Sequence, residues 1–550
     1  MSAICVRPRR WVSPMSYAET ILTDGRVFRG LQKGFAEAVA IAGGRVVAVG
    51  DRASVLSLAG PSTRRIDLAG RVAVPAFNDS HQHLLPLGLT MGQVDLRNDV
   101  APTLDTLLGA IRAAAAKAPP GQWIRGRGFD DSVLDVGRNP TADELSVAAP
   151  NNPVFIVRTC GHVGVANHAA LAVAGIDATT QDPPGGSLDR VDGKPNGSLR
   201  EHAMRLVGRK IAPPSDAQLV DAIDLASQAM LRQGFTRVMD ANVGMTAGMR
   251  EIDAYHTARD GGRLGVRTWM CLAGNPDGIA DAAWERGIRP MQGDDMLRYG
   301  AMKVFCDGSA GGRTAAVTEP YVQGGTGMFI FPTEQFHGLL AKYHRQGWQL
   351  AIHAIGDAAI ETTLVGIEAA DSAAHPIAGR RHRIEHCEFT TPNQIARMAA
   401  RGIEAMPQAI FIYEFGDMYL HNLGAARAHA SNPWRSWIEA GMHPATGSDA
   451  PVSSTDPFRN IHTLVTRRTN RGTVLGADQG LTVAEAVHAY TWAGAYSQFA
   501  EADAGRILPG QIADIAVLSQ DIFACDIEEI PATRADLVVR GGTVAFDRTH

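Results

Sequence analysis

Two histidines separated by a single residue, His81 and His83, are the clearest candidates for chemistry in this sequence of 550 residues. Neutral imidazole nitrogens are common ligands of zinc and related divalent metals. At an extended strand end, side chains at positions i and i+2 point the same way, so both rings can reach one ion. Among 18 histidines, chance alone supplies roughly half of one such pair. The pair therefore predicts a metal site only together with further ligands.

Three further residues could supply those ligands. They are His353 in QLAIHAIGD, His386 in RHRIEHCEF and Asp449 in HPATGSDAP, and each ends an apolar strand candidate. The carboxyl ends of barrel strands meet at one face, where barrel active sites are built. A metal bound there lowers the pKa of a bound water from about 15.7 to about 7. We expect Asp449 to orient that water, accept its proton and deliver it to a leaving amine.

Lys303, in YGAMKVFCDGS, lies inside another apolar strand candidate. An unpaired buried ammonium group is destabilised by several kcal/mol. Two interpretations are open. Lys303 forms an ion pair with a carboxylate such as Asp307, or it is a neutral amine that reacts with CO₂ and becomes a carbamate bridging two metals.

The middle of the chain, over residues 76–504, alternates apolar strand candidates with Ala-rich amphipathic stretches such as PNQIARMAARG. This alternation predicts a parallel sheet, and eight such strands predict a closed α/β fold, the (β/α)₈ TIM barrel. The strand candidates are RVAVPAF, FTRVMDA, VRTWMCLA, AMKVFCDG, QLAIHAIGD, RHRIEHCEF, GIEAMPQ and HPATGSDAP.

The two ends of the chain have a different pattern of apolar residues and turns. Residues 18–75 and 505–550 contain short apolar runs joined by Asp-Gly and Gly-Gly turns, which predicts one small β-sandwich domain built from both termini. About 150 residues separate the first two barrel strand candidates, which predicts an α+β insertion after barrel strand 1. We expect this insertion, over residues 91–215, to help form the substrate pocket. Residues 1–17 are expected to be a loosely ordered leader.

The composition is that of an ordinary globular protein, with 45% hydrophobic and 20% charged residues. A net charge of -5 gives no electrostatic reason to expect nucleic acid or a membrane surface as partner. No apolar run reaches about 18 residues, the length that spans a bilayer. The six cysteines are scattered, which favours free thiols in a reducing compartment over a disulfide framework or a zinc ribbon. We therefore expect a cytoplasmic protein that acts on a small molecule.

Five other residues could contribute to the site, and three of them have two interpretations each. His162, in CGHVGVAN, is either a donor that stabilises the oxyanion of the reaction or a structural histidine. Asp130 either lines the pocket or belongs to a loop turn. Gln408 either faces the substrate or has a packing role. Asp357 is expected to orient a neighbouring ligand, and Asp79 to hold the loop of the first histidine pair.

The strings AVPAFNDSHQH, GAMKVFCDGSAGGRTA, AIHAIGD, RIEHCEF and ATGSDAPV resemble the metal-site blocks of the amidohydrolase superfamily. More narrowly they resemble its YtcJ-like branch (amidohydrolase family 3), which includes N-substituted formamide deformylases. The insertion blocks WIRGRGFDD, VRTCGHVGVAN and GGSLDRVDGKPNGSLRE and the tail GRILPGQIADIAVLSQD are similar to that branch as well. The sequence departs from the branch at His168, where many relatives carry Ser.

The resemblance implies a barrel-plus-β-sandwich fold, a homodimer and a metal site made of His81, His83, Lys303, His353, His386 and Asp449. Zn²⁺ is the expected metal, with iron, manganese or cobalt as alternatives. One or two ions are expected, and two if Lys303 is carboxylated.

The predicted function is hydrolysis of a non-peptide C–N bond in an amide, N-formyl or cyclic amide substrate. A deaminase, an ester or lactone hydrolase, and a metal-dependent isomerase or decarboxylase would use the same metal site. The non-enzymatic alternative is a barrel that serves as a scaffold or binding protein. The presence of all six ligand types argues against that alternative.

Overall fold

The computed structural model describes residues 17–97, 100–131, 134–158, 163–183 and 186–549. The chain divides into two compact units, one made of Met1–Leu85 with Ala226–His550 and the other of Pro86–Leu225. The predicted leader lies outside the described residues except for Tyr17. In the part of the chain that is described, no helix has both the length and the apolar composition needed to cross a bilayer.

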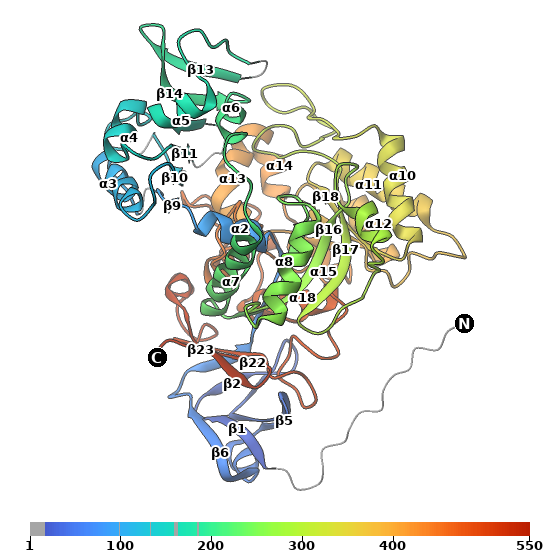
Figure 1. The fold of residues 1–550 in the computed structure, drawn as a ribbon. Helices are drawn as coiled ribbons and strands as arrows, with labels where there is room; N and C mark the ends of the chain where they lie inside the picture. The colour runs from blue at the N-terminus through green and yellow to red at the C-terminus, as the bar shows by residue number, and fades with distance from the viewer. Residues whose placement is uncertain (1–16, 98–99, 132–133, 159–162, 184–185, 550) are drawn as a thin grey trace. The chain divides into compact units, whose positions relative to one another are not determined.

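A sheet of seven parallel strands forms the centre of the larger unit (Figure 1). Neighbours in the sheet follow the order of the chain, as expected for a barrel built from successive strand–helix units. The predicted α/β barrel class is confirmed. The strands are β8 (Phe77–Gln82), β15 (Phe235–Val243), β16 (Arg267–Ala273), β17 (Leu297–Phe305), β18 (Gln349–Ala354), β19 (Arg383–His386) and β20 (Glu404–Met406).

The eighth predicted strand, in residues 443–451, is not a regular strand in the structure. Its backbone still runs along β8, because Ser80 N donates to Thr446 O (3.1 Å) and Asp449 N donates to His81 O (2.7 Å). The φ of +55° at Asp449 breaks the extended conformation. The segment therefore pairs with the first strand without continuing as one.

The first predicted strand, RVAVPAF, is divided between two sheets. Its first part is β7 (Val72–Pro75), which pairs with β2 (Arg26–Phe28) and β21 (Ile515–Leu518) of the terminal domain. The barrel strand β8 begins only at Phe77. His81 consequently lies inside a strand rather than after one.

Helices follow most of the barrel strands. The predicted helical stretch PNQIARMAARG is α12 (Pro392–Arg401), which begins with a capping box between Thr391 and Gln394 and ends at Gly402 with a φ of +63°. The others in this unit are α8 (Met249–Asp260), α9 (Ala280–Glu285), α10 (Thr333–Arg345), α11 (Asp357–Ala370), α13 (Ile410–Leu423), α14 (Ala425–Ala430), α15 (Trp434–Glu439), α16 (Pro457–Thr466), α17 (Val483–Ala489) and α18 (Trp492–Ser497), with 3-10 turns at Ala477–Gln479 and Ile527–Ala532.

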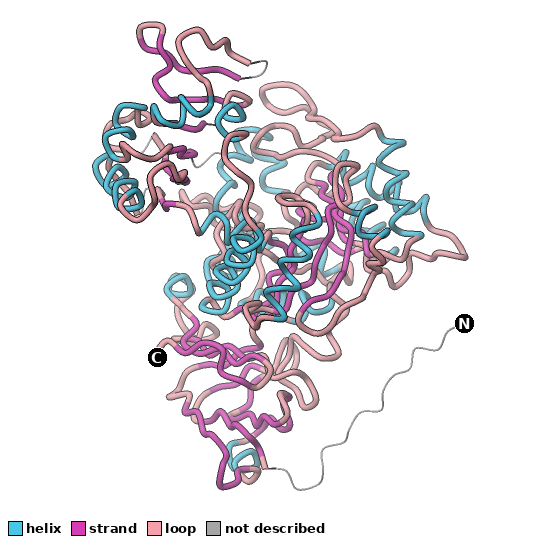
Figure 2. Tube along the Cα trace, in the orientation of Figure 1, coloured by secondary structure: helices cyan, strands magenta, loops and turns pink. Residues whose placement is uncertain are grey.

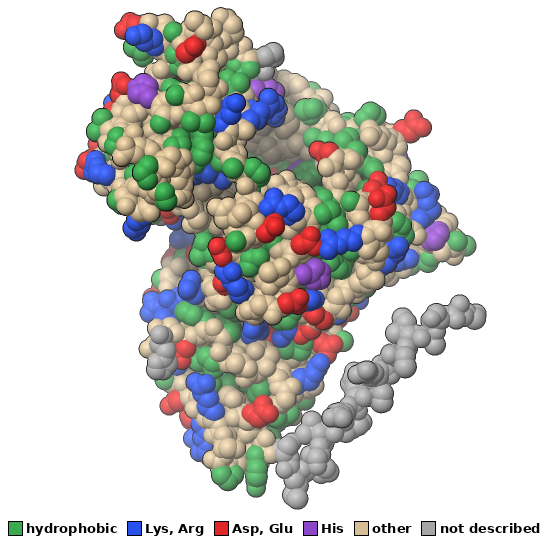
Figure 3. All heavy atoms as spheres, viewed as in Figure 1, with side chains coloured by type: hydrophobic (Ala, Val, Ile, Leu, Met, Phe, Trp, Pro, Cys, Tyr) green, Lys and Arg blue, Asp and Glu red, His purple; other side chains and the backbone are tan. Residues whose placement is uncertain are grey.

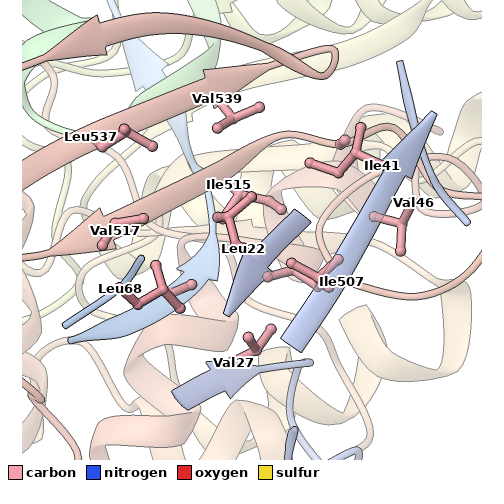
Figure 4. Packing of buried hydrophobic residues seen from close by; sticks show 13 residues of the cluster. Leu22, Val27, Ile41, Val46, Leu68, Ile507, Ile515, Val517, Leu537 and Val539 are labelled. Carbon is pink, nitrogen blue, oxygen red and sulfur yellow. The ribbon is translucent and has the colours of Figure 1, made fainter. Parts of the chain in front are cut away.

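The two ends of the chain meet in the small β-sandwich that the turn pattern predicts (Figures 1 and 2). One sheet has the order β5-β4-β1-β6 and the other β23-β22-β21-β7-β2-β3. Leu22 and Ile41 from the N-terminal end pack against Ile515 and Val539 from the C-terminal end (Figure 4). The remaining elements are β1 (Ala18–Thr23), β3 (Phe35–Ala36), β4 (Ala38–Ala42), β5 (Arg45–Gly50), β6 (Ala59–Asp67), β22 (Ala535–Arg540), β23 (Thr543–Asp547) and α1 (Arg52–Leu56).

The smaller unit follows β8 in the chain and has its own mixed sheet, with the order β13-β14-β12-β11-β10-β9. Its bounds are wider than the predicted 91–215, because they take in parts of α2 (Leu84–Met91) and α7 (Asp216–Arg232). Separate clusters of buried apolar side chains give it a core of its own. The elements are β9 (Val94–Asp95), β10 (Ile124–Phe129), β11 (Val154–Arg158), β12 (Val163–Ala166), β13 (Gly186–Val191), β14 (Lys194–Glu201), α3 (Leu104–Ala115), α4 (Ala142–Ala148), α5 (His168–Ala174) and α6 (Met204–Gly208).

Acidic and basic side chains are interspersed on the face that Figure 3 presents. The four cysteines within the described residues, Cys271, Cys306, Cys387 and Cys525, are free thiols, as the scattered spacing predicts.

Candidate metal centre

Three of the predicted ligands come together at the ends of β8 and of the segment beside it. One ligand atom from each of His81, His83 and Asp449 lies within 4.8 Å of the others. Oδ1 of Asp449 is 3.3 Å from Nε2 of His81 and 3.2 Å from Nε2 of His83. The backbone pairing described above brings these side chains together.

The other three predicted ligands lie beside this group. Nζ of Lys303, on β17, is 3.4 Å from Nε2 of His81. The ring of His386 lies 4.9 Å from that of His81 and 4.5 Å from that of His353, measured between centroids. All six predicted ligands line one cavity of about 400 Å³. We call these six residues the ligand cluster.

Neighbouring groups orient the rings of His353 and His386. Nδ1 of His386 donates to Oε1 of Gln408 (2.6 Å), and Nε2 of His353 donates to the carbonyl of Gly308 (2.9 Å). Each ring keeps its other nitrogen as a lone pair, which is the form that binds a metal. Burial lowers the pKa of His353 to about 3 and lowers that of His386 well below its usual value. Gln408 thus contacts a ligand, whereas a substrate contact was one of the two sequence interpretations.

Glu385 orients His81. Its buried carboxylate accepts hydrogen bonds from Nδ1 of His81 and from the guanidinium of Arg383. Burial acts to raise the pKa of Glu385, but Arg383 and His81 outweigh it and hold that pKa well below its usual range. Glu385 is not among the site residues predicted from the sequence. A signal was present, because Arg383 and Glu385 stand at i and i+2 of an apolar strand and so share one face.

The contact between Asp449 and His81 tests whether a metal fits the site. Burial acts to raise the pKa of Asp449, but the adjacent His81 and His83 rings outweigh it, and the pKa is well below its usual value. Because Nδ1–H of His81 is engaged by Glu385, the neutral ring presents a lone pair toward this carboxylate. Two acceptors 3.3 Å apart need a positive charge between them, either a proton or a metal. Imidazoles and a carboxylate are a donor set that suits zinc or a similar divalent ion.

Lys303 is buried and does not pair with Asp307. The Asp307 carboxylate instead accepts backbone N–H groups of Ala316 (2.9 Å), Ile355 (3.0 Å) and Gly356 (2.9 Å). Among the described residues Lys303 forms no ion pair, and burial lowers its pKa, which favours the neutral amine. The prediction that Lys303 forms an ion pair with Asp307 is therefore wrong.

Asp79 and Asp357, two aspartates with roles predicted from the sequence, both accept hydrogen bonds in the structure. Asp79 accepts from the backbone N–H (3.0 Å) and hydroxyl (2.7 Å) of Ser448 and from His81 N (3.2 Å), so it ties β8 to the segment beside it. Asp357 accepts from Thr318 N (3.0 Å) and is not seen to orient a ligand. The carboxylate beside His353 is instead that of Asp307, whose Oδ1 lies 3.6 Å from Nε2 of His353.

The rest of the cavity is mainly apolar. Helix α13 supplies Phe411, Phe415 and Met418, whose spacing places them on one helix face. With Phe305, Ile355 and Val452 these side chains form what we call the apolar wall. Two ionisable residues outside the ligand cluster also line the cavity, Glu388 and Tyr419, and burial raises the pKa of Glu388 to about 8.

The candidates in the insertion are not assigned to the site. His162 lies outside the described residues. Asp130 forms an ion pair with Arg158 (2.6 Å) within the smaller unit. His168 pairs with the exposed Asp143 (2.6 Å) in the same unit.

Comparisons with known proteins follow the same lines. A sequence profile described as "Amidohydrolase family" matches residues 64–546. The chain is 30% identical over 526 residues to the N-substituted formamide deformylase of Arthrobacter pascens, which covers 94% of this chain and 95% of that protein. It is also 30% identical over 497 residues to the putative amidohydrolase YtcJ of Bacillus subtilis (strain 168), which covers 89% and 92%.

A solved structure agrees with these matches. An uncharacterized metal-dependent hydrolase from Pyrococcus horikoshii OT3 superimposes with a TM-score of 0.76 at 26% identity, covering 92% of this chain and 99% of that one. The predicted resemblance and the predicted enzyme class are confirmed. With a profile match over most of its length and relatives at 30% identity that span nearly all of it, this chain belongs to the amidohydrolase family.

Proposed function

We propose that this protein uses a divalent metal, zinc as first choice, to hydrolyse a non-peptide C–N bond in an amide, N-formyl or cyclic amide substrate. The observation that carries the proposal is the convergence of four histidines, an aspartate and a buried lysine on one cavity. Two relatives of nearly full length, named as a formamide deformylase and a putative amidohydrolase, support the choice of bond. A homodimer and a cytoplasmic location stay predictions from the sequence.

Different residues of the ligand cluster would bind the metal and transfer the proton. His81, His83 and Asp449 would hold the metal, with His353 and His386 beside them. A divalent metal there supplies a Lewis acid that lowers the pKa of a bound water toward 7. Asp449, held anionic by its neighbours, accepts the proton of the attacking water and delivers it to the leaving nitrogen. A C–O bond forms, the C–N bond breaks, and a carboxylic acid and an amine leave.

Lys303 decides how many ions the site holds. As a neutral amine, its Nζ would attack CO₂, form a carbamate and release one proton, and the anionic carbamate would help the ligand cluster to hold a second ion. The burial of Lys303 and the absence of an ion pair among the described residues support this assignment. Native mass spectrometry should find the mass of one CO₂ on the wild-type chain and not on Lys303→Ala. An unmodified wild-type lysine with one bound ion would overturn it.

A substrate screen tests the choice of bond. The full chain should release amines from N-benzylformamide, an N-acetyl amino acid or a cyclic amide, and a chelator should stop the release. An aryl ester, a lactone and an aminopurine serve as probes for the rival reactions. Turnover restricted to these three would overturn the proposal in favour of an esterase, a lactonase or a deaminase.

A further inference from the structure

Glu388 is a buried carboxyl group that the hydrolytic mechanism does not use. It follows the end of β19 by two residues, is 2% exposed and lines the same cavity as the ligand cluster. Its Oε2 meets no hydrogen-bond partner among the described residues. A buried acceptor without a partner destabilises the fold, and native proteins keep few of them without a function.

An unusual backbone conformation precedes Glu388, whose side chain lines the cavity. His386 and Cys387 have φ values of +67° and +54°, which non-glycine residues rarely adopt. Such strain collects at functional sites, where the surrounding structure maintains it. The backbone carbonyl of Glu388 is fixed by the N–H of Asn432 at 2.7 Å. The turn therefore lets both His386 and Glu388 line the cavity.

The surroundings of Glu388 leave it little else to contact. Tyr419 also lines the cavity, and its hydroxyl lies close enough to the carboxyl group to lower the pKa of Glu388 by hydrogen bonding, although neither this hydroxyl nor Oε2 has a partner at full hydrogen-bond geometry among the described residues. The apolar wall adds no hydrogen-bond donor. A substrate that fills this space either supplies no donor, which leaves Oε2 with the imperfectly placed Tyr419 hydroxyl, or supplies a hydrogen-bond donor of its own. The second arrangement avoids the penalty of an unsatisfied buried group.

We propose that Glu388 is a specificity residue that accepts a hydrogen bond from an N–H or O–H group of the substrate, whose remaining surface is apolar and about one aromatic ring in size. A carboxyl oxygen can accept this bond whether or not the group is protonated. The class of substrate is then an amide or formamide that keeps an N–H and carries an apolar substituent. The inference rests on the proposed function in that it takes this cavity as the substrate site.

Two isomeric probes test the donor requirement without turnover. Benzyl alcohol has an O–H donor, whereas anisole has the same atoms and no donor. Ligand-observed NMR titration of the full wild-type chain should give a dissociation constant about five- to tenfold lower for benzyl alcohol, as expected for one hydrogen bond to a buried acceptor. Glu388→Ala should remove this preference and leave anisole binding within about twofold, because the methyl side chain offers no acceptor.

Two further variants make the result specific. Glu388→Gln keeps a carbonyl oxygen and should retain most of the preference, which also covers the case in which the alanine variant fails to fold. Glu414→Ala removes a carboxyl on α13 whose Oε1 accepts from Ser454 N (3.0 Å) and which does not line the cavity, so the preference should be unchanged. Equal binding of the two isomers by wild type, or equal loss of both in the alanine variant, would overturn the proposal.

A kinetic measurement separates this proposal from the proposed function. With N-benzylformamide, Glu388→Ala should raise KM about five- to tenfold with little change in kcat and in metal content. If wild type does not hydrolyse this substrate but the probe preference holds, the proposed reaction is wrong and the role of Glu388 stands. If hydrolysis occurs and neither KM nor the preference depends on Glu388, the reaction stands and this inference is wrong.

Discussion

The two sides of the cavity are built in opposite ways. In the ligand cluster, hydrogen bonds to neighbouring side chains orient the histidine rings. Glu385 orients His81 in this way, and Gln408 orients His386. The apolar wall comes largely from one face of α13, and the carboxyl beside it, Glu388, has an oxygen without a partner among the described residues. The difference indicates that strand ends determine the chemistry and the wall determines the substrate. Changes on the two sides should therefore affect different quantities.

The largest effect is expected from Asp449→Asn. The amide cannot accept a proton from water and is a weaker metal ligand, so kcat should fall about 10²- to 10⁴-fold. Steady-state kinetics and elemental analysis of the purified variant measure the two losses. Asp456→Asn is the matched control, because Asp456 caps α16 and asparagine caps helices equally well. An Asp449→Asn enzyme with the wild-type rate would remove Asp449 from the mechanism.

The second-largest effect is expected at Glu385, which accepts a hydrogen bond from the predicted ligand His81. Glu385→Gln should weaken metal affinity about 10- to 100-fold, as is common when the partner of a ligating histidine is changed. Competition with a chromogenic chelator gives the affinity without any substrate. Glu404→Gln on the adjacent strand is the control, since Glu404 is equally buried but accepts from His443 N (2.9 Å) and touches no ligand. Equal affinities for the two variants would show that Glu385 has no positioning role.

On the other side of the cavity, Phe415→Ala should change substrate choice and leave the metal in place. Loss of an aromatic contact is expected to lower kcat/KM for N-benzylformamide up to about tenfold. The smaller N-methylformamide, which has no ring to pack, should be affected much less. Metal content measured on the same samples should match wild type. A loss of metal in this variant would contradict the separation of the two sides.

The smallest effect is a pH dependence at Glu414, a carboxyl group on α13 that does not line the cavity. Burial raises the pKa of Glu414 from 4.5 to about 7, so the fold favours the protonated carboxyl. The stability linked to this group is complete below 4.5 and is lost as the pH rises through about 7. Relative to wild type, Glu414→Gln should gain about 1–2 °C in Tm at pH 8 and nothing at pH 5. The same difference at both pH values would show that titration of Glu414 is not its cause.

The grouping of these six side chains could be predicted because Lys303 lies within an apolar run and the other five lie at or just after the end of one, and barrel strands bring such ends together. The partners of the ligands could not. Glu385 on β19 contacts His81 on β8, which is not adjacent to β19 in the sheet, and Gln408, just after β20, contacts His386 on the adjacent strand β19. These contacts depend on sheet closure and on register, such as the pairing of Glu385 with Met406, which no local pattern encodes.

Two strand predictions failed for a related reason. The segment HPATGSDAP has the composition of a strand, but the positive φ at Asp449 is set by its contacts with β8. RVAVPAF reads as one apolar run, although Val72–Pro75 and Phe77 belong to different sheets. An apolar run indicates burial but does not say which sheet buries it.

Titration of the metal-free protein with Zn²⁺ tests whether hydrolysis depends on a metal bound by the ligand cluster. The full chain would be freed of metal with a chelator, and the hydrolysis rate of the best substrate followed as Zn²⁺ is added in known amounts. We expect no activity without metal and a linear rise in rate that ends at one or two equivalents of Zn²⁺. The same titration of Asp449→Asn should recover almost none of it. Full activity in the metal-free wild-type protein would contradict the account.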